Sequence, residues 1–185
     1  NKVVIMVGYN HRYHPGIKKA KEIIETRQFG PILFLRARYG HGGRLNYEKE
    51  WRFNPKIAGG GELLDQGSHL IDLVNFFTGP MTKVQGIVSN LFWKSNLEDA
   101  AFFQLSNNKN QYAHLCTTAI EWKNIFEFEI MLKTAKLQIS GLGGSYGQES
   151  LTLYKMKPLM GPPDVEKFDF PQTDGSWKDE THEFF

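Results

Sequence analysis

The sequence predicts an α+β domain built on an open, antiparallel-rich mixed β-sheet with helices packed on one face. Segments with helical apolar spacing come early in the chain, whereas a run of short strand-like segments begins at residue 83. Within that run, residues 126–130 alternate strictly between apolar and charged side chains, which indicates one apolar sheet face. With 185 residues, 41% of them hydrophobic, the chain can bury a substantial core.

The first part of the chain predicts two helices, one strand and a long loop. Residues 15–27 place a proline in the first turn ahead of an apolar stripe, which is typical of a helix. Residues 32–39 alternate and predict a strand, and residues 40–61 are glycine-rich and predict a loop. Loops that long inside compact domains are usually functional. A second helix is expected over residues 62–77, ended by Gly79.

From residue 83 onward the pattern changes to strands. Residues 107–110 predict a hairpin turn between two of them. Aromatic side chains such as Phe102, Phe126 and Phe128 cannot all point toward one helical layer, so part of the apolar surface must face outward. The strands are expected at residues 83–93, 100–106, 111–118, 126–133, 135–140, 150–154 and 165–168.

The two ends of the chain predict a fragment. Residues 3–7 have the apolar composition of a buried strand, which would need partner strands on both sides. Residues 177–185 begin like an amphipathic helix and stop on two phenylalanines. We therefore expect a chain that is cut at both ends.

Composition and charge exclude several classes of function. The net charge is +2 without a long basic run, so no nucleic-acid partner is expected. The apolar stretches are too short to span a bilayer, so no membrane partner is expected either. Cys116 is the only cysteine, which excludes an intrachain disulfide and favours a cytoplasmic location. Its strand neighbours indicate a core residue rather than a nucleophile.

The strongest candidate site follows the triple glycine at residues 59–61. If the chain is helical from Glu62, Asp65 and His69 lie one turn apart on the same face, with Cβ atoms about 5–6 Å apart. A carboxylate can hold an imidazole and raise its basicity while the ring moves a proton. The competing interpretation is an ordinary ion pair on a helix surface. The apolar residues expected to turn toward the core are Leu63, Leu64, Leu70, Leu73, Val74 and Phe77.

A metal site is the main rival interpretation of this pair. Asp65 and His69 could be two ligands, with His41, His11 or His14 as a third. The histidines are scattered, however, and no pair has the familiar metal-binding spacing. No metal is therefore expected.

The glycine-rich segments do not form a dinucleotide-binding fingerprint. Residues 59–61 could cradle a phosphate, but no Gly-x-Gly-x-x-Gly pattern follows a strand with an acidic residue about 20 positions on. Residues 141–146 fail at the last position of that pattern and predict a turn with left-handed residues. No cofactor is therefore expected to bind to this chain by itself.

Four further residues are candidates for substrate binding. Asn10 and Arg12 follow the predicted buried strand, and the carboxyl end of a parallel strand faces the ligand crevice. Trp122 and Asn124 combine an aromatic face with a polar group, as sugar sites do, although tryptophan is most often a packing residue.

Several motifs occurring in order resemble the Gfo/Idh/MocA family of nicotinamide-dependent oxidoreductases. The segment at residues 59–79, GGGELLDQGSHLIDLVNFFTG, resembles its catalytic helix, and residues 7–16, VGYNHRYHPG, resemble the junction that leaves the dinucleotide domain. WRFNPKIAGGG, at residues 51–61, resembles the loop before the catalytic helix. EWKNIFEFEI, with LQISGLGGSYGQESLTLY further on, resembles the sheet of the second domain.

The resemblance implies a fold and a role for each candidate. Residues 1–8 would be the remnant of the last Rossmann-domain strand, and residues 9–185 a truncated substrate-binding and oligomerisation domain like the C-terminal domain of glyceraldehyde-3-phosphate dehydrogenase. His69 would be the acid/base, and Asp65 would bind and orient the substrate. Arg12 and Asn10 would border the active site. Members of the family associate through the open sheet face, so a homo-oligomer is expected.

The implied activity is NAD- or NADP-dependent oxidation of a secondary hydroxyl on a sugar, inositol or related polyol. The cofactor would be held by the missing N-terminal Rossmann domain, which would also carry the family's Glu-Lys-Pro motif. Two other functions stay open: a non-catalytic sugar-binding or oligomerisation module, and an NAD-dependent glycosidase-type relative.

Overall fold

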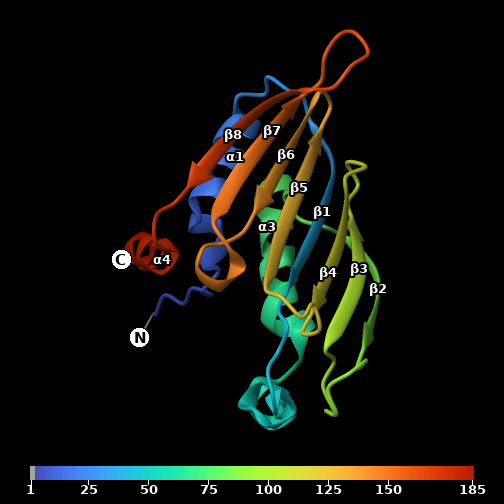
Figure 1. Ribbon diagram of the computed structural model, residues 1–185, viewed down its shortest axis with the longest axis vertical. Coiled ribbons are helices and arrows are strands. Elements are labelled where there is room, and N and C mark those ends of the chain that lie inside the picture. Colours follow the sequence, from blue (N-terminus) through green and yellow to red (C-terminus); the bar gives the residue numbers. More distant parts are fainter. Residues whose placement is uncertain (1–2) are drawn as a thin grey trace.

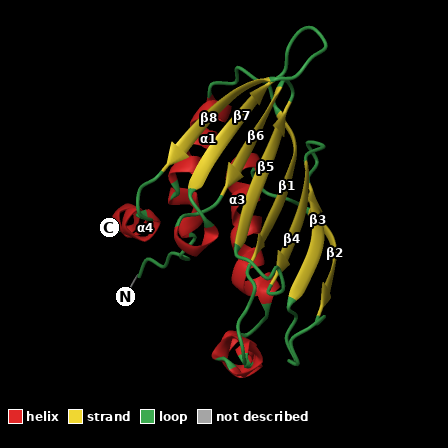
Figure 2. Ribbon diagram, in the orientation of Figure 1, coloured by secondary structure: helices red, strands yellow, loops and turns green. Residues whose placement is uncertain are grey.

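The computed structural model describes residues 3–185, and its eight strands form one sheet in the order β2-β3-β4-β1-β5-β6-β7-β8 (Figures 1 and 2). Neighbouring strands are antiparallel except for the parallel pair of β1 and β4. The expected antiparallel-rich mixed sheet is therefore confirmed. The strands are β1 (Ile32–Gly40), β2 (Lys83–Ser89), β3 (Ala100–Ser106), β4 (Tyr112–Thr118), β5 (Ile125–Leu132), β6 (Ala135–Ser140), β7 (Glu149–Lys155) and β8 (Asp164–Phe170).

The longer helices lie on one side of the sheet, and Figure 1 shows α1 and α3 behind it. Helix α4 lies beside the first residues of the chain, where it contacts η1. The helices are η1 (Asn10–Tyr13), α1 (Pro15–Glu25), η2 (Tyr47–Lys49), η3 (Trp51–Phe53), α2 (Pro55–Ala58), η4 (Leu63–Gly67), α3 (Ser68–Thr78), η5 (Gly144–Tyr146) and α4 (Ser176–Phe184).

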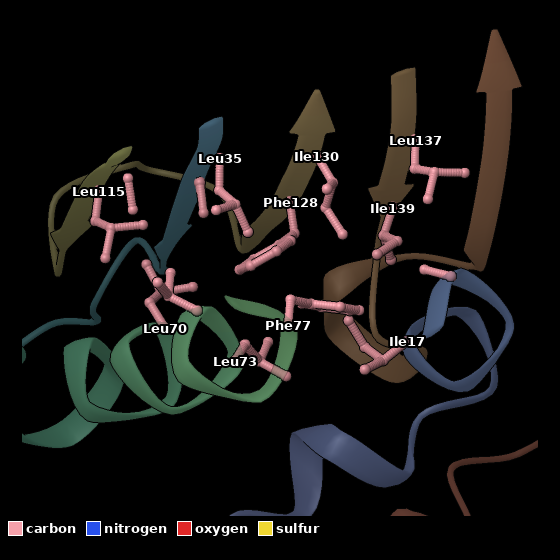
Figure 3. Packing of buried hydrophobic residues seen from close by; sticks show 14 of the residues in the cluster. Ile17, Leu35, Leu70, Leu73, Phe77, Leu115, Phe128, Ile130, Leu137 and Ile139 are labelled. Atoms are coloured by element: carbon pink, nitrogen blue, oxygen red, sulfur yellow. The ribbon is translucent and has the colours of Figure 1, made fainter. Parts of the chain in front are cut away.

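The main core lies between the sheet and helices α1 and α3 (Figure 3). Strand β5 buries every second residue, as its alternation predicts. Substituting a fully buried leucine or isoleucine of this core by alanine typically lowers the free energy of unfolding by about 2–5 kcal/mol. The residues packed across this layer include Ile17 of α1, Leu70, Leu73 and Phe77 of α3, and Leu35, Leu115, Phe128, Ile130 and Ile139 of the sheet.

The opposite face of the sheet is open. Phe102 points outward with 44% of its surface exposed, whereas Phe126 and Phe128 are buried against the helices. The outward aromatic surface expected from strand alternation is thus present, carried by Phe102 and not by the two phenylalanines of β5.

Cys116 lies on this open face and not in the core, so that prediction is wrong. Strand β4 turns Leu115 and Thr117 inward, and the cysteine between them faces the other way and is half-buried. Burial raises the pKa of its thiol to about 11, which leaves it protonated and a poor nucleophile.

The strand expected over residues 3–7 is not formed. Val3, Val4 and Ile5 are exposed, and no strand of the described chain pairs with them. A strand needs the hydrogen-bonding groups of a neighbour, and residues 8–185 offer none at this position. That this segment belongs to a preceding dinucleotide domain stays a prediction.

Other boundaries differ from the expected ones, most clearly those of α1 and β2. Helix α1 ends at Glu25 because Arg27 adopts a left-handed conformation with φ 59°. Strand β2 ends at Ser89, where the carboxylate of Asp99 accepts hydrogen bonds from the backbone N–H groups of residues 91–93 and turns the chain. The turn at residues 141–146 has the expected left-handed glycines, with φ 74° at Gly141.

The long loop over residues 40–61 is more ordered than its composition predicts. It holds three short helices and a small second core. That core is formed by Tyr47, Phe53, Trp93, Leu97 and Ala119. The loop is thereby held firmly beside the start of the helix that carries the candidate site.

Candidate active site

The triple glycine allows the chain to pass very close to a neighbouring loop. A Cβ atom on Gly61 would lie 2.0 Å from the backbone oxygen of Glu98. The Glu98 carboxylate accepts hydrogen bonds from the N–H groups of Gly61 (3.0 Å) and Leu63 (3.3 Å), and its backbone oxygen accepts one from Glu62. A carboxylate at a helix N-terminus satisfies donors that have no partner in the helix.

The expected helix over residues 62–77 begins with a π-helical turn, η4, before it becomes the α-helix α3. Such turns are rare and are frequently found at functional sites. Because the turn changes the helix periodicity, Leu64 points to solvent instead of the core. The spacing between Asp65 and His69 is likewise no longer that of one α-helical turn.

Unpaired polar atoms are concentrated on the inner side of this turn. Within residues 3–185, four buried side-chain atoms have no hydrogen-bond partner: Glu62 Oε2, Gln66 Oε1, His69 Nδ1 and His11 Nε2. Three of the four, those of Glu62, Gln66 and His69, belong to the stretch that contains the π-turn and the start of α3. Buried polar groups are nearly always paired in folded proteins, and a cluster of exceptions indicates a functional site.

His69 lies in an aromatic pocket at this cluster. Its ring stacks on His11, with centroids 4.0 Å apart and an interplanar angle of 27°. Tyr9 and Tyr39 meet the ring edge-on at 5.7 and 6.4 Å. Burial lowers the pKa of His69, while the charges of Asp65 and Asp72 raise it. The ring is therefore neutral near pH 7 and can accept a proton.

The spacing predicted that the Asp65 carboxylate holds His69, and this prediction is wrong. Its Oδ2 atom accepts a hydrogen bond of 3.3 Å from Nε of Arg52, and no hydrogen bond joins it to His69 within the described residues. Asp65 acts on the ring through its charge alone.

A polar cavity of about 350 Å³ opens beside the π-turn. Tyr146 accepts a hydrogen bond of 3.3 Å from Gln66 at its wall. Tyr39 connects the cavity to the acid/base candidate, since its ring centre is 5.3 Å from that of Tyr146 and 6.4 Å from that of His69. Residues lining the cavity include His41, Tyr47, Arg52, Asp65, Gln66, Asn124 and Tyr146.

Sequence reasoning missed the buried group formed by Glu62, His41 and Tyr47. Nδ1 of His41 accepts from the Gly43 N–H at 3.0 Å, so Nε2 carries the proton that faces Glu62 Oε1 at 3.2 Å. The Tyr47 hydroxyl lies 3.1 Å from the same nitrogen. Burial raises the pKa of Glu62, while His41 opposes that shift. The position of Glu62, seven residues before His69, was the available signal.

The four predicted substrate residues have different surroundings. Asn124 lines the cavity, where its amide donates to Ser145 Oγ at 2.7 Å. Trp122 is 62% exposed and packs against Phe92 rather than lining the cavity.

Arg12 and Asn10 are engaged by the protein itself. The Arg12 guanidinium binds both carboxylate oxygens of Asp72, with Nε 2.7 Å from Oδ2. Asn10 is buried and donates to Ser176 Oγ at 2.8 Å. In this structure both residues fix the junction segment to α3 and α4.

The triple glycine does not present a free N–H at Gly61. This N–H, a donor of the kind that binds phosphate, already donates to the Glu98 carboxylate. Within residues 3–185 no three His, Cys, Asp or Glu side chains gather in a way that could hold a metal. None of the helices in that range has the length and apolar character needed to cross a bilayer.

Comparisons with known proteins agree with this architecture. The family described as GFO/IDH/MocA C-terminal domain matches residues 17–145. Levoglucosan dehydrogenase of Pseudarthrobacter phenanthrenivorans is 35% identical over 89 residues, which are 47% of this chain and 23% of that protein. Mouse glucose-fructose oxidoreductase domain-containing protein 1 is 30% identical over 88 residues, or 47% of this chain and 22% of that protein.

Solved structures share the fold over nearly the whole chain. Levoglucosan dehydrogenase in complex with NADH and levoglucosan matches 98% of this chain and 55% of its own, with a TM-score of 0.80 and 21% identity. Aldose-aldose oxidoreductase from Caulobacter crescentus, complexed with glycerol, matches 95% of this chain and 51% of its own, with a TM-score of 0.78 and 20% identity. The chain thus spans about half the length of the solved relatives it matches.

Proposed function

Because the chain belongs to the GFO/IDH/MocA family through its C-terminal domain, we propose that it is the substrate side of an NAD(P)-dependent oxidoreductase. The substrate is a sugar, inositol or related polyol that is oxidised at a secondary hydroxyl. The observation that carries this proposal is a neutral, partly buried imidazole, His69, among unpaired polar atoms, on the same helical stretch as Asp65 and Gln66, which line a polar cavity.

In the proposed reaction, His69 removes the proton of the substrate hydroxyl as the C–H bond of the carbinol carbon breaks. The nicotinamide, held by another domain, accepts the hydride, so the carbinol becomes a carbonyl and the two electrons leave with the hydride. Asp65 favours the protonated imidazole through its charge. The cavity, with Gln66, Asn124 and Tyr146 in its wall, supplies hydrogen-bonding groups for the remaining hydroxyls.

The cofactor belongs to a preceding Rossmann domain, of which residues 1–8 are the last part in this proposal, while residues 9–185 form the substrate and oligomerisation domain. The chain alone should show no measurable affinity for NAD or NADP, because the phosphate-binding turn supplies most cofactor contacts. Calorimetric titration tests this point, and micromolar affinity would overturn it.

The decisive experiment uses the full-length protein with a panel of neutral sugars and polyols, including levoglucosan and inositol. We expect NADH or NADPH to accumulate in proportion to the carbonyl product. The His69→Ala variant should lose this turnover. The matched control is His182→Ala, since this histidine is exposed on α4, away from the cavity. Equal turnover by wild type and His69→Ala would overturn the proposal.

The same assay separates the two alternative functions. A sugar-binding or oligomerisation module would bind panel members without reducing the cofactor. A glycosidase-type relative would cleave glycosides with no net change in cofactor. Neither outcome is expected.

We also infer that the open sheet face binds a second copy of the chain. Ile87, Phe102 and Tyr112 are exposed there, and a groove of about 1040 Å³ runs across strands β1 to β4. Large exposed apolar patches are typical of protein interfaces. A cytoplasmic location forms part of the proposal, in keeping with the single, unpaired Cys116.

A further inference from the structure

We propose that His11 is the positioning residue of His69. Its stacked ring holds the His69 imidazole in place, the role that the spacing had assigned to Asp65. The inference rests on the proposed role of His69 as proton acceptor. It adds to that role a residue from the junction segment, 58 positions earlier in the chain.

The hydrogen bonds of His11 fix its ring. Nδ1 lies 3.1 Å from the amide oxygen of Asn10, and the Asn10 amide nitrogen donates to Ser176 Oγ at 2.8 Å. Because an amide oxygen only accepts, Nδ1 of His11 carries the proton. The lone pair is then on Nε2, the buried atom that has no partner.

Packing also fixes the orientation of the His11 ring. His11 is 5% exposed and lies among the rings of Tyr39, Phe126 and His14, at centroid distances of 5.1, 5.9 and 5.7 Å. A ring enclosed in this way cannot turn without displacing its neighbours. His69 therefore stacks on a face that is fixed from Ser176 through Asn10 to His11.

Asp65 cannot serve this purpose in the same way. Its carboxylate is 46% exposed and is directed to Arg52. No side chain forms a hydrogen bond with the His69 ring within residues 3–185, and its Nδ1 atom is one of the buried unpaired atoms. The stack with His11 is the closest ring contact of His69, nearer than Tyr9 or Tyr39.

The stack also limits where the proton can go. Burial, then the nearby rings of His69 and His14, lower the pKa of His11 well below its ordinary value, so His11 stays neutral. When His69 takes the substrate proton, the cation faces a neutral aromatic ring, a favourable arrangement. Two protonated rings in the stack would repel each other, so the pair carries at most one positive charge.

Charged and titratable groups approach this pair from each packed element. The carboxylates that face it belong to the helix of His69, and both are paired with arginines. The full set of charged and titratable groups around the two rings is Asp65 from η4, Asp72 from α3, Tyr9, Arg12 and His14 from the junction and its flanks, Tyr39 from β1, Tyr146 from η5 and Arg52 from η3.

The experiment compares His11→Ala and His11→Phe in the full-length protein, with His182→Ala as control. In His11→Ala the ring of His69 loses its support, and kcat should fall about 10- to 100-fold with little change in KM. Burial is the main cause that lowers the pKa of His69, and water would enter beside the ring in His11→Ala, so that pKa should rise and the acidic limb of kcat/KM should move to higher pH. His11→Phe keeps a flat, buried ring and should restore most of kcat and the wild-type limb.

The inference is overturned if His11→Ala keeps wild-type kcat and pH dependence, or if His11→Phe is as defective as His11→Ala while both are folded. Nitrogen NMR of the histidine rings gives a readout independent of turnover: His69 should titrate at higher pH in His11→Ala than in wild type. Should His11→Ala fail to fold, Asn10→Ala, which frees the ring of His11, replaces it with the same expected direction.

Failure of this inference is distinguishable from failure of the proposed function. If His69→Ala abolishes turnover but His11→Ala does not reduce it, only the positioning role is lost. If His69→Ala itself is fully active, the proposed function fails regardless of His11.

Discussion

Oδ2 of Asp65 lies 3.3 Å from Nε of Arg52, on the side of the π-turn that opens to the cavity. The arginine comes from the long loop, which is anchored by its own small core. Asp65 is therefore shared between a cation on the loop and an imidazole that it reaches only through its charge. The basicity of His69 depends on how strongly Arg52 neutralises this carboxylate.

Opposite pH shifts should follow from changing the two partners. Asp65→Asn removes a charge that raises the pKa of His69, so that pKa falls and the neutral base persists to lower pH. The acidic limb of kcat/KM should then move to lower pH. Arg52→Gln leaves the carboxylate unneutralised and should move the limb to higher pH. Rate measurements across pH on the full-length protein check this, and shifts in the same direction would contradict it.

The ion pair of Arg12 with Asp72 should contribute to stability more than ordinary surface pairs do. Asp72 is 6% exposed, and Arg12→Ala would leave its buried carboxylate without the guanidinium. We expect the free energy of unfolding to fall by about 1–3 kcal/mol, toward the lower end because Arg12 is partly exposed. Arg12→Lys should retain only part of this stabilisation, since lysine lacks the forked donor of arginine.

Chemical denaturation measures this loss. Lys18→Ala is the control, because its partner Asp179 is exposed and the pair should contribute nothing measurable. Equal losses in Arg12→Ala and Lys18→Ala would show that the junction is not fixed by the buried carboxylate.

Gly61→Ala should damage the site through the backbone. The added Cβ would lie 2.0 Å from the Glu98 oxygen, so the π-turn or the facing loop must move. We expect a loss of about 1–3 kcal/mol in stability, together with a lower kcat. Gly175→Ala is the matched control, since a Cβ there meets nothing within 4 Å and φ is −104°. A Gly61→Ala protein as stable and active as Gly175→Ala would refute the close approach.

The sheet could be predicted from sequence because strand alternation is a local property. The alternation around Phe128 gives the buried face of β5 directly, and the turn residues at 107–110 give the hairpin between β3 and β4. The strand predicted at residues 3–7 is not formed, because its apolar composition is a local property whereas a strand also needs a partner strand. The prediction that Cys116 is a core residue was wrong because its apolar neighbours do not reveal which face of the strand it occupies.

The site was only partly predictable. The sequence identifies His69 and the loop beside it, but a spacing of four residues predicts an Asp65–His69 contact only in a regular α-helix. The start of the π-turn is held by hydrogen bonds that the Gly61 and Leu63 N–H groups donate to Glu98, a residue of a distant loop. The stack with His11 joins segments far apart in sequence, and no local pattern contains it.

Association through the open face should depend on its apolar residues. Ile87 pairs with Phe102 across β2 and β3, and both are exposed. Ile87→Lys combined with Phe102→Lys should convert an associating protein to monomers, because burying two charges in an apolar interface is costly. Sedimentation measures this. Glu22→Lys, a charge change on α1 at the opposite side, should leave the association unchanged, and a wild-type monomer at high concentration would refute the interface.

The pH dependence of kcat/KM in the full-length protein, compared between wild type and His69→Ala, tests the central claim most directly. If His69 is the base for oxidation, wild-type kcat/KM should fall as pH drops through its lowered pKa, because the protonated ring cannot accept the substrate proton. His69→Ala should lower kcat by about 10²- to 10⁴-fold and lose that acidic limb. Wild-type turnover in the alanine variant, with the acidic limb intact, would show that His69 is only a packing histidine and that another group moves the proton.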